Sequence, residues 1–448
     1  MHSKIVIVGG GAGGLELACK LGRKLGPSQV ILVDSRLYHI WKPSLHEVAA
    51  GTLDIHQEGL SYQMLAHDNG FTYVYGALTG LDAAASQLTV AAIATAEQEE
   101  VLPERRIGFE SLVLAIGSTS NYFGVPGAKE HTISLNATED AERFRLTLLK
   151  LLTKAALKKG APASGPAGAS GPAGASAAAP SGVDIVIIGG GATGVELAAE
   201  LREASGVYAA YGFGHLDPLQ DVRITLLEGA PRILAPLPER VSAAALKLLR
   251  ERAITVVTGT RVTAIDAERV TVADGPRYAA DIVVWAAGIK APDLLGTLGL
   301  PTAKGGQLDV NGDLTVKGHA HIYALGDCAL CLGADGKAVP PRAQAAHQQA
   351  DYLLHTFLRQ AQGKPPQSGP YVYKDYGSLV SFGQTSSVGS LMGSLKGLNW
   401  FVDGFVARLM YTSLHLMHHQ AVLGSVRTGV LALARFLIKR TTPLVKLH

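Results

Sequence analysis

Two glycine-rich segments have the residue types and the spacing of a dinucleotide-binding turn. Each fits G-x-G-x-x-G, follows a short apolar run (IVIV or IVII) and precedes a helical pattern of Ala and Leu. The first glycine permits the tight turn, the second lets a pyrophosphate approach the backbone, and the third lets helix and strand pack closely. The phosphates then meet free N–H groups at a helix N-terminus. The glycines are Gly9, Gly11 and Gly14 in the first segment and Gly189, Gly191 and Gly194 in the second.

An acidic residue ends the next apolar run after each glycine turn. These residues are Asp34 in QVILVDS and Glu228 in RITLLEGA. Each carboxylate can accept hydrogen bonds from the ribose hydroxyls of an adenosine, although an acid at a strand end that simply faces solvent is the alternative. Because a carboxylate repels a 2′-phosphate, Glu228 favours NADH over NADPH, while the nearby Arg232 leaves use of NADPH open.

A third segment, HIYALGDCA, places a Gly-Asp pair after another apolar run. In flavin enzymes with this duplicated plan, such an aspartate lies on the ribityl chain, so Asp327 is the candidate here and Gly326 lets the backbone come close. Two dinucleotide motifs in one chain therefore indicate two dinucleotides, FAD and NADH. Gly117 in LVLAIGSTS and Gly288 in VVWAAGIKAP end strands just before the chain crosses between domains.

An internal repeat sets the architecture that must position these residues. Residues 5–21 reappear as residues 185–201, and each copy opens a βαβ unit. We therefore predict an α/β fold with two Rossmann-like dinucleotide-binding domains, for FAD and for NADH, and a C-terminal amphipathic-helical region that binds membranes. The predicted divisions are 1–125 (FAD domain, first part), 126–159 (helical connection), 160–182 (Gly/Pro/Ala/Ser linker), 183–298 (NADH domain), 299–370 (FAD domain, second part) and 371–448 (membrane-binding region).

Composition excludes several other classes of protein. The net charge of +3 over 448 residues is too small to indicate a nucleic-acid partner. Three cysteines give no disulfide framework. The N-terminus begins a strand with no signal-peptide pattern, and no uninterrupted apolar run reaches the 18 residues of a membrane span.

The C-terminal stretch GSVRTGVLALARFLIKR, residues 424–440, has the pattern of an interfacial helix. Residues 401–448 contain six Lys or Arg against one acid, and each cation near anionic lipid contributes about 1 kcal/mol. We expect this helix to lie on a bilayer, and a helix packed on the core or across a homodimer interface is the alternative. On a helical wheel the apolar face holds Val426, Val430, Leu433, Ala434 and Leu437, and the opposite face holds Ser425, Thr428, Arg435 and Lys439.

The chain resembles the type II NADH dehydrogenases, the single-subunit NADH:quinone oxidoreductases of respiratory membranes, and the proteobacterial members most clearly. The resemblance covers nearly the whole chain except the linker. It implies FAD on the first and third segments, NADH on the middle one, and flavin contacts from Asp34, Ser35, His39, Leu78, Asp327, Ala343 and Gln344. The segments that carry it are KIVIVGGGAGGLELA, HIWKPSLHEVAAGTLD, LVLAIGSTSNYF, GGGATGVELAAEL, VVWAAGIKAPD, ALGDCA, PPRAQAAHQ and YKDYGSLVS.

The resemblance also names two candidate catalytic residues. Glu196 falls on the family's glutamate near nicotinamide and flavin, and we expect it in the first turn of its helix, where the dipole stabilises an acid. Gln344, at the start of a helix expected from about Arg342, is placed to bond the flavin or the quinone head. His347, on the same face, is either a proton relay or a structural histidine.

No metal centre is predicted. Cys328 and Cys331 form C-x-x-C, a weak candidate for a soft metal or a disulfide, but the two further ligands of a zinc site are missing from the pattern. The segment HIWKPSLHEV, which we expect to wrap the flavin ring with Pro43 and Trp41 or Leu45, lacks the reactive cysteine of related disulfide reductases.

The predicted function is that of a respiratory NADH:quinone oxidoreductase that does not pump protons. It binds FAD non-covalently, reduces a membrane quinone, and lies on the cytoplasmic face of a bacterial inner membrane as a peripheral protein. The enzyme alternative is a soluble NADH-dependent flavin reductase of oxygen or of a protein acceptor. The alternative that is not an enzyme is a nucleotide-binding redox sensor at the membrane.

Overall fold

The first glycine turn follows an inner strand, β1, of a mixed sheet. The computed structural model describes residues 1–160, 182–211, 213–367, 369–383, 386–392, 399–438 and 445–446, so the predicted linker lies almost wholly outside the described residues. In the seven-stranded sheet, parallel strands run in the order β5-β2-β1-β10, β22 joins β10, and β7 and β6 extend the sheet antiparallel. The strands are β1 (His2–Val8), β2 (Val30–Asp34), β5 (Thr72–Tyr75), β6 (Leu78–Asp82), β7 (Gln87–Val90), β10 (Arg105–Leu114) and β22 (Ile322–Ala324).

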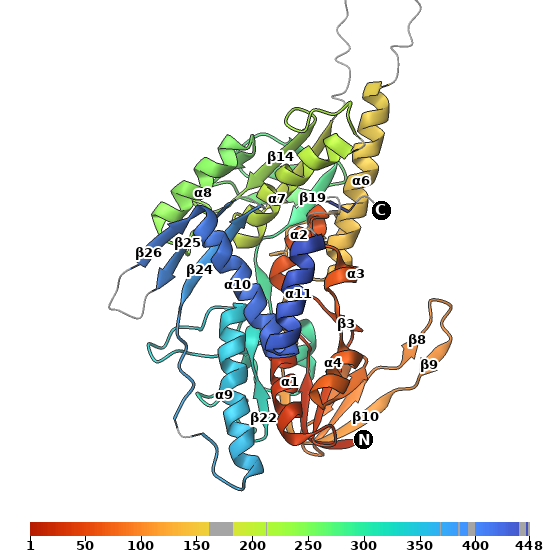
Figure 1. Ribbon diagram of the computed structural model, residues 1–448, viewed down its shortest axis with the longest axis vertical. Helices are drawn as coiled ribbons and strands as arrows, with labels where there is room; N and C mark the ends of the chain where they lie inside the picture. Colours follow the sequence, from red (N-terminus) through yellow and green to blue (C-terminus); the bar gives the residue numbers. More distant parts are fainter. Residues whose placement is uncertain are drawn as a thin grey trace, which may run out of the picture.

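Two helices cover this sheet and both begin at its carboxyl edge. Helix α1 (Ala12–Leu25) starts directly after the glycine turn, and α9 (Ala343–Ala361) packs beside it (Figure 1). The expected helix start near Arg342 is confirmed, because Arg342 is the N-cap of α9. Glu16 and Lys20 of α1 pair with His347 and Asp351 of α9, and these ion pairs join two segments more than 300 residues apart.

The second glycine turn follows the central strand of a second, wholly parallel sheet. Its order is β12-β19-β13-β14-β15, and α7 (Ala192–Tyr211) begins at its turn. The edge strand β12 and α6 (Thr138–Gly160) both come from the segment predicted as a helical connection. The strands are β12 (Ile133–Ser134), β13 (Val183–Ile188), β14 (Val222–Leu227), β15 (Thr255–Val257) and β19 (Ile282–Trp285), and α8 (Glu239–Glu251) follows β14.

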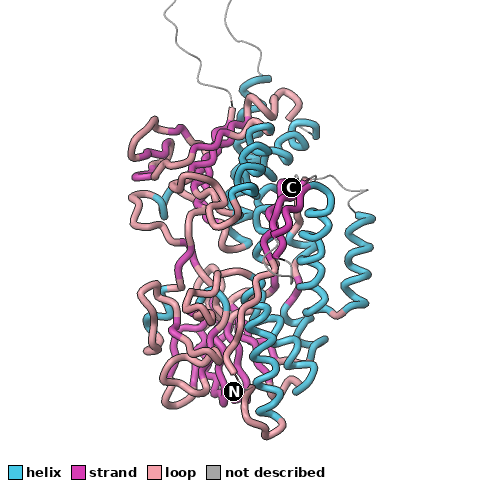
Figure 2. The backbone as a smooth tube through the Cα atoms, turned by 90° about the vertical axis from the view of Figure 1, so that its left-hand side faces the viewer, coloured by secondary structure: helices cyan, strands magenta, loops and turns pink. Residues whose placement is uncertain are grey.

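The two sheets lie one above the other, with most of the helices on one side of the molecule (Figure 2). Smaller elements connect and cover them. These are β3 (Tyr38–His39), α2 (Leu45–Ala50), α3 (Ile55–Glu58), β4 (Leu60–Ser61), α4 (Tyr62–Asn69), β8 (Ile93–Ala94), β9 (Glu100–Leu102), β11 (Thr119–Ser120), α5 (Ala128–His131), β16 (Val262–Ile265), β17 (Arg269–Val272), β18 (Tyr278–Ala279), β20 (Ile289–Lys290), β21 (Leu308–Asp309) and β23 (Ala329–Leu330).

The C-terminal region contains a sheet that the sequence did not predict. An antiparallel three-stranded sheet precedes the two expected helices α10 (Gly404–Leu423) and α11 (Ser425–Ile438). Its strand β24 packs on α7, with Val380 and Phe382 buried in the second core. Glycine and serine interrupt the alternation of apolar and polar residues that would predict these strands. Their formation therefore depends on tertiary packing rather than on the local pattern. The strands are β24 (Gly377–Phe382), β25 (Ser386–Met392) and β26 (Asn399–Asp403).

Helices α10 and α11 pass across both halves of the molecule (Figure 1). Arg23 of α1 donates to the carbonyl oxygen of Ala421, which ties α10 to the first half. The apolar face predicted for α11 is exposed: Val426, Val430, Leu433 and Leu437 are 55–81% accessible, whereas Thr428 of the opposite face is buried. Within the described residues, none of the helices combines the length and the apolar character needed to cross a membrane.

The close contact at the second glycine turn gives a stability prediction. A Cβ on Gly194 would overlap the carbonyl oxygen of Gly189, while a Cβ on Gly206 in the same helix would meet nothing within 4 Å. We expect Gly194→Ala to destabilise the protein by about 1–3 kcal/mol and Gly206→Ala to stabilise it by roughly 0.5–1 kcal/mol. Urea unfolding of both variants checks this, and equal effects would contradict the contact.

Candidate functional site

A single large cavity lies where the two glycine turns face each other. Its volume is about 1740 Å³, larger than the roughly 300–1,000 Å³ of a site for one drug-sized ligand. The carboxyl ends of the parallel strands, the N-termini of α1, α7 and α9, and one side of α10 contribute to its walls. The cavity therefore has room for a dinucleotide together with a second ligand.

The first glycine turn leaves its backbone open to this cavity. Gly9 has φ +105°, and a Cβ there would overlap the carbonyl group of Ala115. A Cβ on Gly14 would overlap the carbonyl oxygen of Gly9, whereas a Cβ on Gly11 would meet nothing within 4 Å. Gly9 and Gly14 are thus needed for packing, and Gly11 is the position where a phosphate can reach the backbone.

Asp34 ends β2 beside the first turn, as predicted. Its carboxylate accepts from the backbone N–H of Gly10 at 2.6 Å and of Arg36 at 2.8 Å. Burial raises the pKa of Asp34 above its ordinary value, and the hydrogen bond from Gly10 offsets part of this rise. The acid is held at the edge of the cavity rather than out in solvent, which favours the ribose-binding interpretation.

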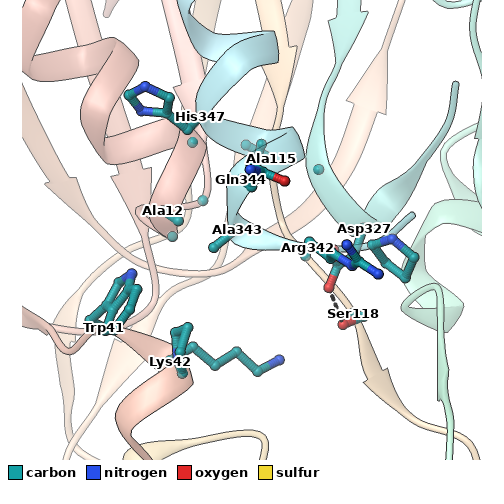
Figure 3. A pocket seen from close by; sticks show the side chains of 18 of the residues that line it. Ala12, Trp41, Lys42, Ala115, Ser118, Asp327, Arg342, Ala343, Gln344 and His347 are labelled. Atoms are coloured by element: carbon teal, nitrogen blue, oxygen red, sulfur yellow. Dashed lines mark hydrogen bonds between the residues drawn. The ribbon is translucent and has the colours of Figure 1, made fainter. Parts of the chain in front are cut away.

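Asp327 stands on the opposite side of the cavity at a backbone position that requires glycine before it. Gly326 has φ +72°, and its N–H donates to the side-chain oxygen of the buried Gln349 at 2.7 Å. The hydroxyl of Ser118 donates to Asp327 at 2.8 Å (Figure 3). Sequence reasoning missed Gln349, which reads as an ordinary polar residue of an amphipathic helix, and it missed Ser118.

Lys42 is a third residue that the sequence did not single out. Its side chain extends into the cavity toward Ser118 and Asp327 (Figure 3). The surrounding protein desolvates the ammonium group and lowers its pKa below the ordinary value, while Asp327 acts in the opposite direction. A cation at this position adds positive potential to the site. The only signal in the sequence was its place inside HIWKPSLHEV.

His39 connects the first glycine turn with the C-terminal helices. Its Nδ1 lies 2.9 Å from the carbonyl oxygen of Gly10, and its Nε2 lies 2.9 Å from Nε2 of His418 in α10. Burial lowers the pKa of His39 to about 4 and the pKa of His418 well below its ordinary value. Both imidazoles are therefore neutral at pH 7, and one donates to the other. His418 was missed because a helix of the C-terminal region gave no reason to place it here.

The start of α9 presents Gln344 to the cavity. Its side-chain oxygen accepts from the hydroxyl of Tyr373 at 2.8 Å, and Figure 3 shows the amide among the lining residues. His347, one turn further, lies 2.7 Å from Glu16, and this contact raises the pKa of its imidazole. The ion pair supports the structural interpretation of His347 over a proton relay.

The second glycine turn repeats the geometry of the first. Gly189 has φ +113° and could not carry a Cβ without overlapping Ala286. The carboxylate of Glu228 accepts from the backbone N–H of Gly190, as Asp34 does from Gly10. Arg232 donates to the hydroxyl of Ser242 at 2.6 Å and to carbonyl oxygens of its own loop.

Glu196 requires a correction. It was expected in the first turn of its helix, but α7 begins at Ala192 and its first turn holds no acid. Dipole stabilisation therefore does not apply. Burial instead raises the pKa of Glu196 to about 7, although His46 opposes the shift. The carboxylate accepts from the backbone N–H of Ser381 at 3.0 Å and lies 3.7 Å from His46.

The three cysteines are buried in the protein interior. All three are free and buried, so Cys328 and Cys331 are not joined. Burial raises the pKa of Cys328 to about 11 and of Cys19 to about 12, and also raises that of Cys331. Since the thiolate is the reactive and metal-binding form, burial disfavours both roles for these thiols.

Most of the predicted residues meet at this cavity. Gly14, Gly189, Gly194 and Glu228 stand outside its lining. Both third glycines serve helix packing, Gly189 packs against Ala286, and Glu228 accepts from the N–H of Gly190. The predicted residues that line the cavity are Gly9, Gly11, Asp34, Ser35, His39, Leu78, Gly117, Gly191, Glu196, Gly288, Asp327, Ala343 and Gln344, together with Trp41, Pro43, Leu45 and His347.

Two dinucleotide turns that share one cavity define an oxidoreductase with two nucleotides. A family model described as pyridine nucleotide-disulphide oxidoreductase matches residues 3–350. A type II NADH:quinone oxidoreductase of Haemophilus influenzae is 36% identical over 99% of both chains, and a demethylphylloquinone reductase of Synechocystis is 28% identical over 94% of both. The chain therefore belongs to the pyridine nucleotide-disulphide oxidoreductases, and within them to the type II NADH:quinone oxidoreductases.

A solved structure supports the fold. The structure described as NDH2 from Plasmodium falciparum in complex with NADH matches with a TM-score of 0.78, at 19% identity, over 99% of this chain and 100% of that one. The predicted α/β fold with Rossmann-type domains is confirmed, as are the cofactors FAD and NADH. The residues fit FAD. Gly11 has open space beside it for a phosphate, and the tight turn at Gly9 leaves no room for a Cβ. Asp34 and Asp327 both line the cavity.

The raised pKa of Glu196 gives a prediction on stability against pH. A glutamate with a pKa of about 7 when folded and 4.5 as its ordinary value binds more protons when folded, so stability falls as pH rises from about 4.5 to 7 and then stays lower. The contribution is of the order of 3 kcal/mol. We expect Glu196→Gln to flatten the profile, measured by urea unfolding at pH 5 and pH 8. An unchanged slope would show that Glu196 is not responsible.

Proposed function

We propose that the chain oxidises NADH and reduces a membrane quinone at this one cavity, with electrons passing through FAD. The observation that carries the proposal is that a single continuous cavity is lined by both glycine turns, by Asp327 and Gln344, and by one side of α10. The family supports the same function. When bound, FAD supplies the redox chemistry, taking two electrons from NADH and giving them to the quinone.

The chain's own residues hold and polarise the nucleotides. Asp34 and Glu228 are placed to accept from ribose hydroxyls, and Asp327 is placed to accept from the ribityl chain. The N-terminus of α9 has no side-chain cap, so its backbone N–H groups and dipole act on the cavity at Ala343 and Gln344. Together with Lys42, this end of the cavity favours negative charge.

The quinone is proposed to enter beside α10. Leu414 and Met417 line the cavity and are also 42% and 55% exposed. They form an apolar rim between the surface of α10 and the interior. An isoprenoid chain can occupy such a rim while the polar head reaches Gln344. Glu196, with its pKa near 7 and with His46 beside it, is placed to take up or release a proton in the same cavity.

The exposed face of α11 is proposed to lie on the bilayer. Four aliphatic side chains project from it, and half-burying each in lipid contributes roughly 1 kcal/mol. The described cations contribute less than the sequence indicated, because Arg427 pairs with Asp68, Arg435 with Glu58, and Lys446 with Asp54. Apolar contact rather than charge is then the main attraction. Attachment to the cytoplasmic face of a bacterial inner membrane is part of this proposal.

Two further parts of the proposal concern organisation. The predicted division into an FAD domain in two parts, an NADH domain at 183–298 and a C-terminal region is supported by the two separate parallel sheets. A homodimer that pairs the α11 faces of two chains is the alternative occupant of that surface. Detergent-dependent light scattering distinguishes it from a monomer held by lipid.

Gln344 gives a test of the acceptor reaction. Gln344→Leu removes the amide and leaves the hydroxyl of Tyr373 without this acceptor, so we expect quinone-dependent turnover to fall about tenfold while NADH still bleaches the flavin absorbance. The matched control is Gln360→Leu in the same helix, since Gln360 donates to Tyr323 at 3.4 Å and lies outside the cavity. Stopped-flow absorbance separates the half-reactions. No quinone-dependent oxidation by the unaltered chain would refute the proposed function.

Leu433 gives a test of membrane attachment. Leu433→Asp places a charge on the exposed face of α11, and we expect sedimentation with anionic liposomes to weaken about tenfold or more. Activity with a water-soluble short-chain quinone should remain. The control is Leu157→Asp on α6, a leucine of similar exposure away from that face. Equal losses in both variants would argue against α11 as the attachment surface.

A further inference from the structure

A group of three side chains with metal-ligand chemistry lies outside the cavity. It consists of Glu58 at the end of α3 and of His415 and His419, one turn apart on α10. Their ligand atoms all lie within 4.8 Å of one another. The cavity lining includes none of these three residues, although Trp41, which packs on His415 with ring centroids 4.9 Å apart, belongs to both places.

The hydrogen bonds of the two imidazoles identify Nε2 as the acceptor nitrogen of each ring. Nδ1 of His419 lies 3.0 Å from the carbonyl oxygen of His415 and donates to it, so Nε2 keeps its lone pair. Nε2 of His415 lies 3.3 Å from the guanidinium of Arg435 and therefore accepts. The two rings stack with centroids 4.4 Å apart and planes 14° apart, and one ligand atom of each lies within 4.8 Å of the other and of a Glu58 oxygen.

We propose that Glu58, His415 and His419 form a binding site for a divalent cation that prefers imidazole ligands, with Zn²⁺ the best match. Two neutral imidazole nitrogens and one carboxylate supply three ligands, and water can complete a tetrahedron. The pair of histidines at i and i+4 presents both nitrogens from one face of α10. The site is separate from nucleotide and quinone binding, so it does not depend on the proposed function.

Arg435 lies among the three proposed ligands. Its guanidinium donates to both oxygens of Glu58 and to His415. The protein has thus already placed a positive charge among the three ligands, which compensates the half-buried carboxylate. A dication must displace this guanidinium. Arg435 belongs to α11 and Glu58 to α3 (Figure 1). Metal binding would therefore break the ion pair between α11 and α3, and the metal would connect α10 to α3 instead.

The competition between Arg435 and the metal gives a distinctive test. Isothermal titration of ZnCl₂ into the tag-free, FAD-loaded full-length chain should show one site per chain. Arg435→Gln removes the competing cation, so we expect it to bind Zn²⁺ several-fold more tightly than the unaltered protein. If Arg435 did not compete with the metal, Arg435→Gln would leave the Zn²⁺ affinity unchanged. Co²⁺ in place of Zn²⁺ should give the intense visible absorption of a tetrahedral site.

Two ligand variants complete the experiment. His415→Ala with His419→Ala should abolish the site, and Glu58→Gln should weaken it by about tenfold or more. The control is His67→Ala, an exposed histidine of α4 beside Asp68, which should bind Zn²⁺ like the unaltered chain. Flavin absorbance and thermal unfolding verify that each variant is folded. The proposal is overturned if the double histidine variant retains the site, if Arg435→Gln weakens it, or if neither the unaltered chain nor Arg435→Gln binds Zn²⁺.

Discussion

The contact between a helix and the glycine turn that precedes it is the constraint on which the rest of the structure depends. In both halves the third glycine of the turn meets the carbonyl oxygen of the first, and any side chain at Gly14 or Gly194 would force the helix away. With the helix in place, its N-terminal N–H groups point at the end of a parallel strand. Because residues of both turns line the same cavity, it can hold two nucleotides side by side.

Polar groups around the cavity are divided into neutral and charged ones by burial. His39 and His418 are neutral because both are buried and because they bond each other. Lys42 and the start of α9 supply positive potential at one end, and Glu196 has a pKa near 7 at another. These differences in protonation suit a two-electron reduction, because the added negative charge can be stabilised by the positive end of the cavity and neutralised by protons.

The C-terminal helices link this chemistry to a surface. Helix α10 reaches the cavity through His418 and carries His415 and His419 on a neighbouring face, while α11 turns its aliphatic side chains outward. Thr428 of its opposite face is buried, and Arg435 and Arg427 are paired with acids of the first half. The sites proposed for an acceptor, a bilayer and a cation therefore use different side chains of these two helices.

The sequence by itself determined the two glycine turns, the acid that ends the strand after each turn, the position of Asp327 after a glycine, and the amphipathic character of α11. Each of these rests on local spacing that the backbone geometry of a turn or helix enforces. Tertiary structure alone decided which distant groups meet. It brought Gln349 to Gly326, His418 to His39 and Tyr373 to Gln344, and it placed Glu196 beyond the first turn of α7, where burial replaces the expected dipole. It also decided that the cations of α11 are paired. These contacts join residues that are 23 to 379 positions apart and leave no periodic trace in a single sequence. Burial, which shifts each pKa, exists only once the chain has folded.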